Sequence, residues 1–217
     1  MNYFIEYMNQ KNGKNSLGLD SCFEDLDNPI DLFKKWFKKA EETEINDPNA
    51  VALATADQKN QPSVRMVLLK GLSDKGFVFY TNFNSKKGSD LKSNQQASMC
   101  FHWKSLRRQV RVIGQVEQVT EQEADEYYNS RPYKNRISAW ASNQSEQLES
   151  REVFLKKIAE FEKKYPDINN VPRPPHWSGW RILPKEIEFW LDGEGRIHER
   201  LNYINQKGKW AKEILYP

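Results

Sequence analysis

The chain has 217 residues, with 33 lysines and arginines against 30 aspartates and glutamates, and a net charge of +3. This balance gives no indication of nucleic-acid binding, and the seven tryptophans argue against a disordered chain. No run approaches the roughly 20 apolar residues of a membrane span, and the N-terminus lacks the apolar core of a signal peptide. Cys22 and Cys100 lie far apart, which predicts two free thiols in a reducing compartment. The composition therefore predicts a soluble cytoplasmic protein with no nucleic-acid or membrane partner.

Residues 1–28 are polar and irregular, and they are predicted to form a mobile N-terminal arm. Asn28 and Pro29 then supply a cap and a first-turn proline for a helix. Over the next four turns or so, apolar residues recur at helical spacing, at Leu32, Phe33, Trp36, Phe37 and Ala40. This pattern predicts an amphipathic helix whose apolar face packs in the core.

Beyond Asp47-Pro48 the sequence changes to short β-favouring runs that are separated by turn signals. Strands are predicted at 50–56, 63–72, 76–82, 97–104 and 107–119, with a short helix at 85–94. Because the links between most of these strands are of hairpin length, the fold class is α+β, mostly β, with an antiparallel sheet or barrel.

Helical patterns return at 121–129, 132–142 and 147–165, and Pro166 ends the last of them. A proline-rich connector at 169–176 leads to closing strands predicted at 177–183, 186–191, 196–205 and 209–215. Strands at both ends, with helices between them, predict that residues 29–217 form a single domain.

Two pairs of cations stand near the ends of predicted strands. Arg65 and Lys70 are five positions apart, so a regular strand would turn them to opposite faces unless it is bent or bulged. Lys86 and Lys87 follow Ser85, a candidate cap, in the first turn of a helix, where the helix dipole disfavours cations. A bound phosphate would remove that conflict, and a solvated lysine pair is the alternative.

The stretch from Ile187 to Arg200 combines a β-favouring run, a turn at Asp192–Gly195 and alternating basic residues. If the last part is a strand, Arg196, His198 and Arg200 share one face. Such a face suits anions and polarised rings, and a solvated hairpin face is the alternative.

Further polar residues lie at strand and helix ends. Gln109 shares a strand face with Arg111 and offers an amide to a heterocycle, although an exposed strand residue is the alternative. Tyr127, Arg131 and Asn135 follow helical spacing that Pro132 interrupts, which places Arg131 near a new helix N-terminus.

Other signatures of chemistry are absent from the sequence. It contains no phosphate-binding P-loop, no GxGxxG, no Ser-His-Asp set and no metal-ligand spacing, so no metal is predicted. The sequence offers several cations that could bind anions, together with aromatic rings and amides, and no strong nucleophile. This set suits a phosphorylated cofactor that carries out the chemistry itself.

From about Pro29 to Pro217 the chain resembles the pyridoxamine 5′-phosphate oxidase family through motifs that occur in order. They are RMVLLK (65–70), FYTN (79–82), SKKG (85–88), RQVRV (108–112), SRP (130–132), AWASNQS (139–145), WSGWRI (177–182) and IEFW…RIHER (187–200). The resemblance implies an FMN-binding split β-barrel with peripheral helices, in a homodimer with FMN at the interface. It implies oxidation of pyridoxamine 5′-phosphate and pyridoxine 5′-phosphate to pyridoxal 5′-phosphate, with O2 as acceptor and H2O2, and NH3 from the amine, as products.

The resemblance also implies site residues. For FMN they are Arg65, Met66, Val67, Leu68, Leu69, Lys70, Tyr80, Thr81, Lys86, Lys87, Gln109, Gln144, Ser145, Trp190 and Arg200. Arg65 would face the FMN phosphate, and Gln109, Gln144, Ser145, Trp190 and Arg200 would complete the site across the dimer. For the substrate they are Lys70, Tyr127, Arg131, Asn135, Arg196 and His198, of which the first four would hold the phosphate. Arg196 and His198 would be the catalytic residues beside the reacting carbon.

The sequence departs from the family pattern at three places. Lys86 stands where an arginine is usual, which loses a bidentate contact and predicts weaker FMN binding. Asn135 replaces a serine, and residues 4–7 retain only Glu-Tyr of a basic Arg-Arg-Glu-Tyr. The alternatives are a split-barrel flavin reductase and a non-enzymatic carrier of FMN or pyridoxal phosphate. The predicted second phosphate site argues against both.

Overall fold

The computed structural model describes residues 14–217, which form two compact units. The first unit comprises the chain up to Leu53, Ser98–Gly114 and Pro184–Pro217. The second comprises Ala54–Ala97 and Gln115–Leu183. Residues 1–13 of the predicted N-terminal arm, which include the Glu-Tyr pair at 6–7, lie outside the described residues.

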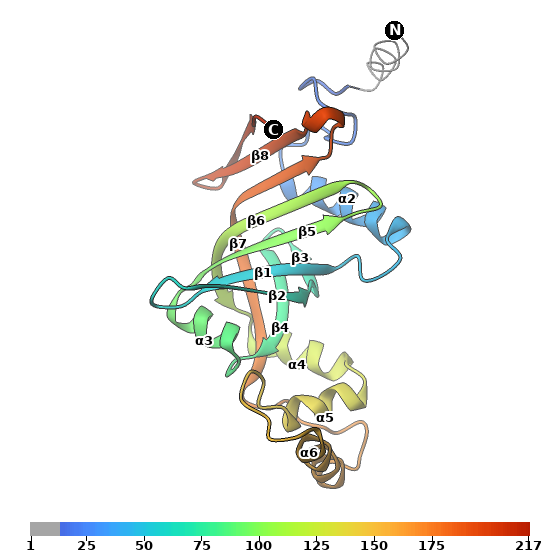
Figure 1. Cartoon of the computed structure of the whole chain (residues 1–217), viewed down its shortest axis with the longest axis vertical. Coiled ribbons are helices and arrows are strands. Elements are labelled where there is room, and N and C mark those ends of the chain that lie inside the picture. Colours follow the sequence, from blue (N-terminus) through green and yellow to red (C-terminus); the bar gives the residue numbers. More distant parts are fainter. Residues whose placement is uncertain (1–13) are drawn as a thin grey trace. The chain divides into compact units, whose positions relative to one another are not determined.

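The strands in the described part of the chain form an extensive sheet (Figure 1). They are β1 (Ala50–Ala56), β2 (Pro62–Leu68), β3 (Gly71–Ser73), β4 (Gly76–Asn82), β5 (Gln96–Trp103), β6 (Arg108–Gln118), β7 (Trp177–Leu191), β8 (Glu199–Gln206) and β9 (Lys209–Ile214). Their order is β2-β1-β5-β6-β7-β4-β3, and β8 pairs with β7 and β9. The pairs β3–β4, β4–β7, β7–β8 and β8–β9 are antiparallel, which confirms the predicted mostly β architecture.

The helices lie close to their predicted positions. They are α2 (Pro29–Thr43), α3 (Lys86–Ser93), α4 (Glu121–Ser130), α5 (Tyr133–Ala141) and α6 (Arg151–Lys164). Helix α6 begins later than predicted because Ser150 caps it and accepts a hydrogen bond from the Val153 N–H. Among the described residues, no helix is long and apolar enough to cross a membrane.

The first unit is organised around helix α2. Asn28 caps it as predicted, since its side chain accepts a hydrogen bond of 3.0 Å from the Ile30 N–H. Trp36 is buried and contacts Phe23 and Phe189, with ring centroids 5.3 and 5.2 Å away. Burying each such side chain contributes roughly 1.5–3 kcal/mol. Phe23 is fully buried, so packing already begins inside the described part of the predicted arm.

The second unit places α3, α4 and α5 around the end of β4 (Figure 1). Strand β4 pairs with β7, with Tyr80 opposite Gly179. Helix α3 approaches β4 closely because Gly88 has no side chain; a Cβ there would lie well inside 3.0 Å of the Phe83 carbonyl. Helix α6 packs on α5 through Trp140 and Phe161, whose ring centroids are 5.7 Å apart.

The closing strands differ from the prediction in two ways. The segments predicted as 177–183 and 186–191 form one strand, β7, despite Pro184. Residues Trp177–Ile182 pair with β4 and Glu186–Leu191 pair with β8, so Pro184 lies between these two paired segments.

Strand β8 begins only at Glu199, so the predicted strand alternation of Arg196, His198 and Arg200 is wrong. Residues Glu194–Arg196 form a 3-10 turn instead. Gly193 permits this turn, because a Cβ at that position would collide with the Ile197 carbonyl.

Candidate active site

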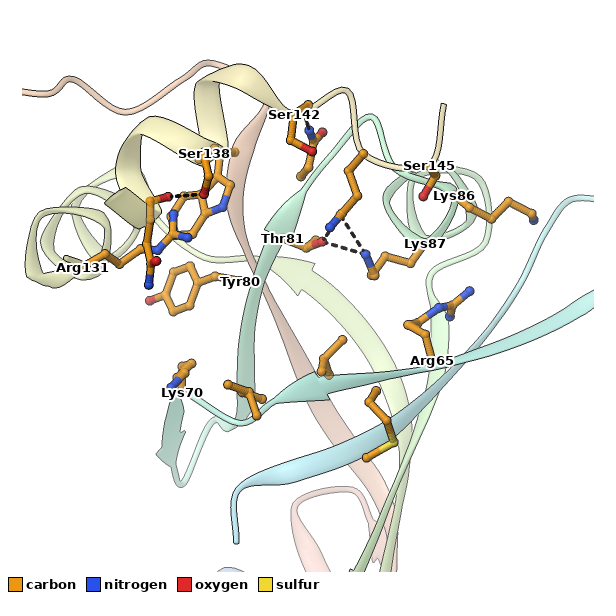
Figure 2. A pocket seen from close by; sticks show the side chains of 18 of the residues that line it. Arg65, Lys70, Tyr80, Thr81, Lys86, Lys87, Arg131, Ser138, Ser142 and Ser145 are labelled. Atoms are coloured by element: carbon orange, nitrogen blue, oxygen red, sulfur yellow. Dashed lines mark hydrogen bonds between the residues drawn. The ribbon is translucent and has the colours of Figure 1, made fainter. Parts of the chain in front are cut away.

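A cavity of about 1050 Å³ opens in the second unit, and every residue that lines it belongs to that unit (Figure 2). Cavities for small ligands usually measure about 300–1,000 Å³, so this one is large enough for two small ligands side by side. Most of the predicted contacts in this unit line it: Arg65, Met66, Val67, Leu68, Lys70, Tyr80, Thr81, Lys86, Lys87, Tyr127, Arg131, Asn135, Gln144 and Ser145. Leu69 does not line the cavity and is buried in the core instead.

The interruption between strands β2 and β3 brings Arg65 and Lys70 to the same cavity. Strand β2 ends at Leu68 and β3 begins at Gly71, so the predicted single strand over 63–72 is divided. Between them the Lys70 N–H donates to the Val78 carbonyl at 2.8 Å. The bend was one of the two alternatives that the spacing of Arg65 and Lys70 left open, and the structure confirms it.

One end of the cavity is cationic, and Lys87 is its most buried cation. The Lys87 ammonium donates to Thr81 Oγ1 at 3.0 Å, to Gln144 Oε1 at 3.0 Å and to Ser85 Oγ at 3.3 Å. Burial, and then the positive charge of Arg65, lower the pKa of Lys87 to about 8. Its hydrogen-bond acceptors within the described chain are neutral oxygens, so this buried ammonium is electrostatically suited to an anion.

Helix α3 supports this end as the sequence predicted. Ser85 caps the helix, and its side chain accepts from the Gly88 N–H. Lys86 also lines the cavity, and it pairs with Asp90 at 2.6 Å and lies 3.8 Å from Asp57. The two lysines therefore differ, because Lys86 has acidic partners and Lys87 has none within residues 14–217.

The opposite end of the cavity is aromatic. Tyr80 stacks on Tyr127 with ring centroids 4.0 Å apart and on Trp177 at 5.4 Å. Gly179 makes this stack possible, because a Cβ there would lie 2.8 Å from the Tyr80 ring. Figure 2 shows Arg131 and Tyr80 on one side of Thr81, and Arg65, Lys86 and Lys87 on the other.

Arg131 has an unsatisfied donor at the aromatic end. Its guanidinium lies over the Trp177 ring, 4.6 Å from the centroid, at the junction of α4 and α5. Burial lowers its pKa, and its Nη1 is buried without a hydrogen-bond partner in residues 14–217. A buried donor of this kind costs about 1–3 kcal/mol when it is left unpaired, so the position is suited to an anionic ligand. The predicted location of Arg131 near a new helix N-terminus is confirmed.

The loop after α5 covers the region between the two ends. Asn82 donates to the Ser142 carbonyl at 3.1 Å, which ties the loop to the end of β4. Gln144 joins the cationic end through Lys87, and Ser145 has a left-handed backbone with φ of 75°.

The remaining predicted contacts, Gln109, Trp190, Arg196, His198 and Arg200, belong to the first unit. Gln109 is half-buried on β6 beside the fully buried Val110. Arg200 Nε donates to the buried Glu188 at 2.8 Å, and its Nη1 donates to the Tyr216 carbonyl at 2.8 Å. Arg200 is therefore held rigidly on β8, opposite Trp190 of β7.

His198 lies in the loop before β8 and contacts the Trp190 ring, with centroids 4.7 Å apart. Its Nδ1 accepts from the Gly193 N–H at 3.1 Å and lies 3.1 Å from Asp192 Oδ1. The Gly193 N–H favours a neutral ring with its proton on Nε2, whereas the Asp192 carboxylate favours one with its proton on Nδ1. Asp192 in turn receives two hydrogen bonds from Arg107, at 3.0 and 2.7 Å.

Arg196 is exposed, and its backbone has φ of 64° in the 3-10 turn. A positive φ is uncommon outside glycine, and such residues concentrate at functional sites. The pattern of alternating charges predicted a strand here, and the structure has a 3-10 turn and a loop instead.

Several residues of the site were not predicted from the sequence. Trp177 and Phe154 line the cavity, and the buried Asp90 contacts two of its cations. Trp177 carried a signal, since it begins the WSGWRI motif. Phe154 and Asp90 carried none, because each depends on how a helix packs against a distant strand or loop.

The sheet and its helices place the chain in the split-barrel class of proteins. The structure of PhzG from Burkholderia lata 383 in complex with tetrahydrophenazine-1-carboxylic acid superposes with a TM-score of 0.85 at 30% identity, covering 94% of this chain and 100% of that one. A pyridoxamine 5′-phosphate oxidase-related, FMN binding protein from Nostoc punctiforme PCC 73102 shares the fold, with a TM-score of 0.68 at 16% identity over 85% of this chain and 96% of that one.

Sequence comparison narrows the class to a family. The profile described as pyridoxamine 5′-phosphate oxidase matches residues 37–165, and the pyridoxine 5′-phosphate oxidase C-terminal dimerisation region matches residues 177–217. The pyridoxine/pyridoxamine 5′-phosphate oxidase of Pelagibacter ubique is 60% identical, covering 95% of this chain and 100% of the relative. That of Sinorhizobium fredii is 56% identical, covering 90% and 95%. The chain belongs to the pyridoxine/pyridoxamine 5′-phosphate oxidase family, which confirms the resemblance seen in the sequence.

Proposed function

We propose that the chain is an FMN-dependent oxidase that converts pyridoxamine 5′-phosphate and pyridoxine 5′-phosphate to pyridoxal 5′-phosphate. The observation that carries the proposal is a single cavity with separate anion-binding positions at its two ends, around Lys87 and around Arg131. A simple carrier of one phosphorylated ligand needs only one of them. Two phosphorylated ligands, a cofactor and a substrate, account for both.

The FMN phosphate is assigned to the cationic end. Lys87 donates there from a buried position, and Thr81 and Gln144 hold its ammonium in place. Arg65 adds a guanidinium, anchored by Thr55 at 2.7 Å and by the Ser63 hydroxyl at 2.6 Å. The exposed apolar side chains of β2, Val64, Met66 and Leu68, offer a surface for the flat ring system. When bound, FMN supplies the acceptor for the two electrons that leave the exocyclic carbon of the substrate.

The substrate phosphate is assigned to the aromatic end. Arg131 Nη1 would donate to it and so satisfy the buried donor. Lys70 and Asn135 line the same cavity and add a cation and an amide, and Tyr127 contributes its ring to the stacked wall. Holding the substrate by its phosphate orients the reacting carbon, and orientation of this kind is worth several kcal/mol of the barrier.

The first-unit residues Gln109, Trp190, Arg196, His198 and Arg200 are assigned to the partner subunit of a homodimer. The match of residues 177–217 to a dimerisation region supports this arrangement. Arg196 would orient the substrate and favour negative charge at the reacting atoms. O2 is the final electron acceptor in the proposal, giving H2O2, and the amine substrate releases NH3.

His198 is proposed to move a proton at Nε2. Asp192 Oδ1, 3.1 Å from Nδ1, would accept a hydrogen bond from a protonated Nδ1 and leave Nε2 free to take and return a proton.

The test is to purify the protein, record its visible spectrum and then add pyridoxamine 5′-phosphate under air. We expect a yellow protein that produces aldehyde and H2O2 in equal amounts. A colourless protein that FMN fails to reconstitute would contradict the proposal. A yellow protein that leaves the substrate untouched would indicate a flavin reductase, and ligand binding without peroxide would indicate a carrier.

A further inference from the structure

A buried carboxylate, Asp90, lies behind the cationic end of the cavity and does not line it. Its exposed fraction is 2%. Oδ1 accepts from the Lys86 ammonium at 2.6 Å, and Oδ2 accepts from the Thr55 hydroxyl at 2.7 Å. Arg65 Nη2 is 3.8 Å from the same Oδ2. One carboxylate therefore contacts two of the three cations at this end.

Thr55 extends the contact from Asp90 to Arg65. Its hydroxyl accepts from Arg65 Nη1 at 2.7 Å and donates to Asp90 at 2.7 Å. A hydroxyl has a single proton, so accepting from Arg65 directs that proton to the carboxylate. The orientation of the Arg65 guanidinium thus depends on Asp90 both through Thr55 and through the charge pair.

From these contacts we infer that Asp90 is a positioning residue for the phosphate-binding cations, and the inference rests on the assignment of the FMN phosphate to this end. Asp90 holds Lys86 and Arg65 at the rim, while the hydrogen-bond acceptors of Lys87 are neutral oxygens. A buried carboxylate beside a phosphate would otherwise oppose binding, so its benefit must come through geometry.

The substitution Asp90→Asn separates geometry from fold. Asparagine has the same shape but replaces one acceptor oxygen with an N–H2 group. That group would face either Lys86 or Thr55 and Arg65, all of which are donors in this network, so at least one of the contacts is lost. Losing one hydrogen bond to a charged group predicts a loss of phosphate affinity on the order of 10-fold or more.

The experiment compares FMN with riboflavin, which lacks the phosphate, by titrating the full-length apoprotein and following flavin fluorescence. The ratio of the two dissociation constants reports the phosphate contacts alone. We expect Asp90→Asn to lower the preference for FMN about 10-fold and to leave riboflavin affinity unchanged. Thr55→Val, which leaves the Asp90 carboxylate in place, should lower the preference for FMN by a smaller factor.

Asp57→Asn is the matched control. Asp57 lies 3.8 Å from the same lysine but, unlike Asp90, is partly exposed. The Asp57→Asn substitution should leave the ratio of the FMN and riboflavin dissociation constants unchanged. An Asp90→Asn protein that prefers FMN as strongly as wild type overturns the inference, as does an equal loss of FMN and riboflavin affinity. If wild type itself binds FMN and riboflavin equally, the phosphate assignment has failed instead.

Discussion

Lys87 is the residue on which the charge of the cavity depends most. It is buried among Thr81, Ser85 and Gln144, and burial, followed by Arg65, lowers its pKa from 10.5 to about 8. In the unliganded protein, unfolding therefore takes up a proton between about pH 8 and 10.5. The unliganded fold accordingly gains stability as pH rises through this window.

This pKa leads to a prediction for FMN binding. A phosphate dianion favours the ammonium form, so binding raises the pKa of Lys87 and takes up a proton above about pH 8. FMN affinity should fall as pH rises from 8 to 10, by at most about tenfold per pH unit. Titration of the apoprotein at several pH values measures this fall.

The controls are Lys87→Arg, which keeps its charge over this range, and Lys87→Met, which has none. Both should bind FMN with little pH dependence from 8 to 10. If Lys87→Arg shows the same fall as wild type, the proton is taken up elsewhere.

At the residue scale, the sequence predicted the cations but not how each is paired. Arg65, Lys86 and Lys87 are all basic residues in motifs, and only the fold shows that Lys86 has acidic partners while Lys87 has none within residues 14–217. The pairing depends on Asp90 and Thr55, which are 35 positions apart and meet only when α3 packs beside β1. No local pattern contains that information.

At the scale of elements, two glycines decide how closely the walls of the cavity approach. Gly88 lets α3 lie against the Phe83 carbonyl, and Gly179 lets the Tyr80 ring lie across β7. Helices and strands with long regular patterns were predicted well, because burial repeats along them. The break between β2 and β3 and the 3-10 turn before β8 were set by pairing with other strands, which the pattern of a single segment does not contain.

Gly88→Ala should weaken the cationic end. The new methyl group would collide with the Phe83 backbone carbonyl and force α3 away from it, because backbone atoms cannot move aside as the end of a flexible side chain can. We expect a loss of about 1–3 kcal/mol in the free energy of unfolding and weaker FMN binding. Ser89→Ala, at an exposed position of the same helix, is the control and should leave both unchanged. Equal urea midpoints for the two variants would contradict this account.

Gly179→Ala should act on the aromatic end. Its Cβ would lie 2.8 Å from the Tyr80 ring and 2.9 Å from the Val119 side chain, so the stack of Tyr80 on Tyr127 must shift. The KM for pyridoxamine 5′-phosphate should rise several-fold while FMN affinity is retained. An unchanged KM would show that the stack does not position the substrate.

At the scale of the whole molecule, the proposal divides each active site between two subunits. The cavity is made by the second unit alone, while His198 lies in the first. Arg131→Met and His198→Ala proteins should each have strongly reduced activity at a low concentration of pyridoxamine 5′-phosphate. When they are unfolded and refolded together, half of the dimers are mixed and each mixed dimer has one intact site, so about a quarter of wild-type activity returns. Sites formed within one subunit would give no recovery.

The central claim is that one cavity binds two phosphates at opposite ends. The most direct measurement is a pair of ratios, the affinity for FMN over riboflavin and the kcat/KM for pyridoxamine 5′-phosphate over pyridoxamine. We measure both in wild type, Lys87→Met and Arg131→Met. Lys87→Met should lower the first ratio and leave the second, whereas Arg131→Met should lower the second and leave the first. If either variant lowers both ratios equally, the two ends are not separate phosphate sites.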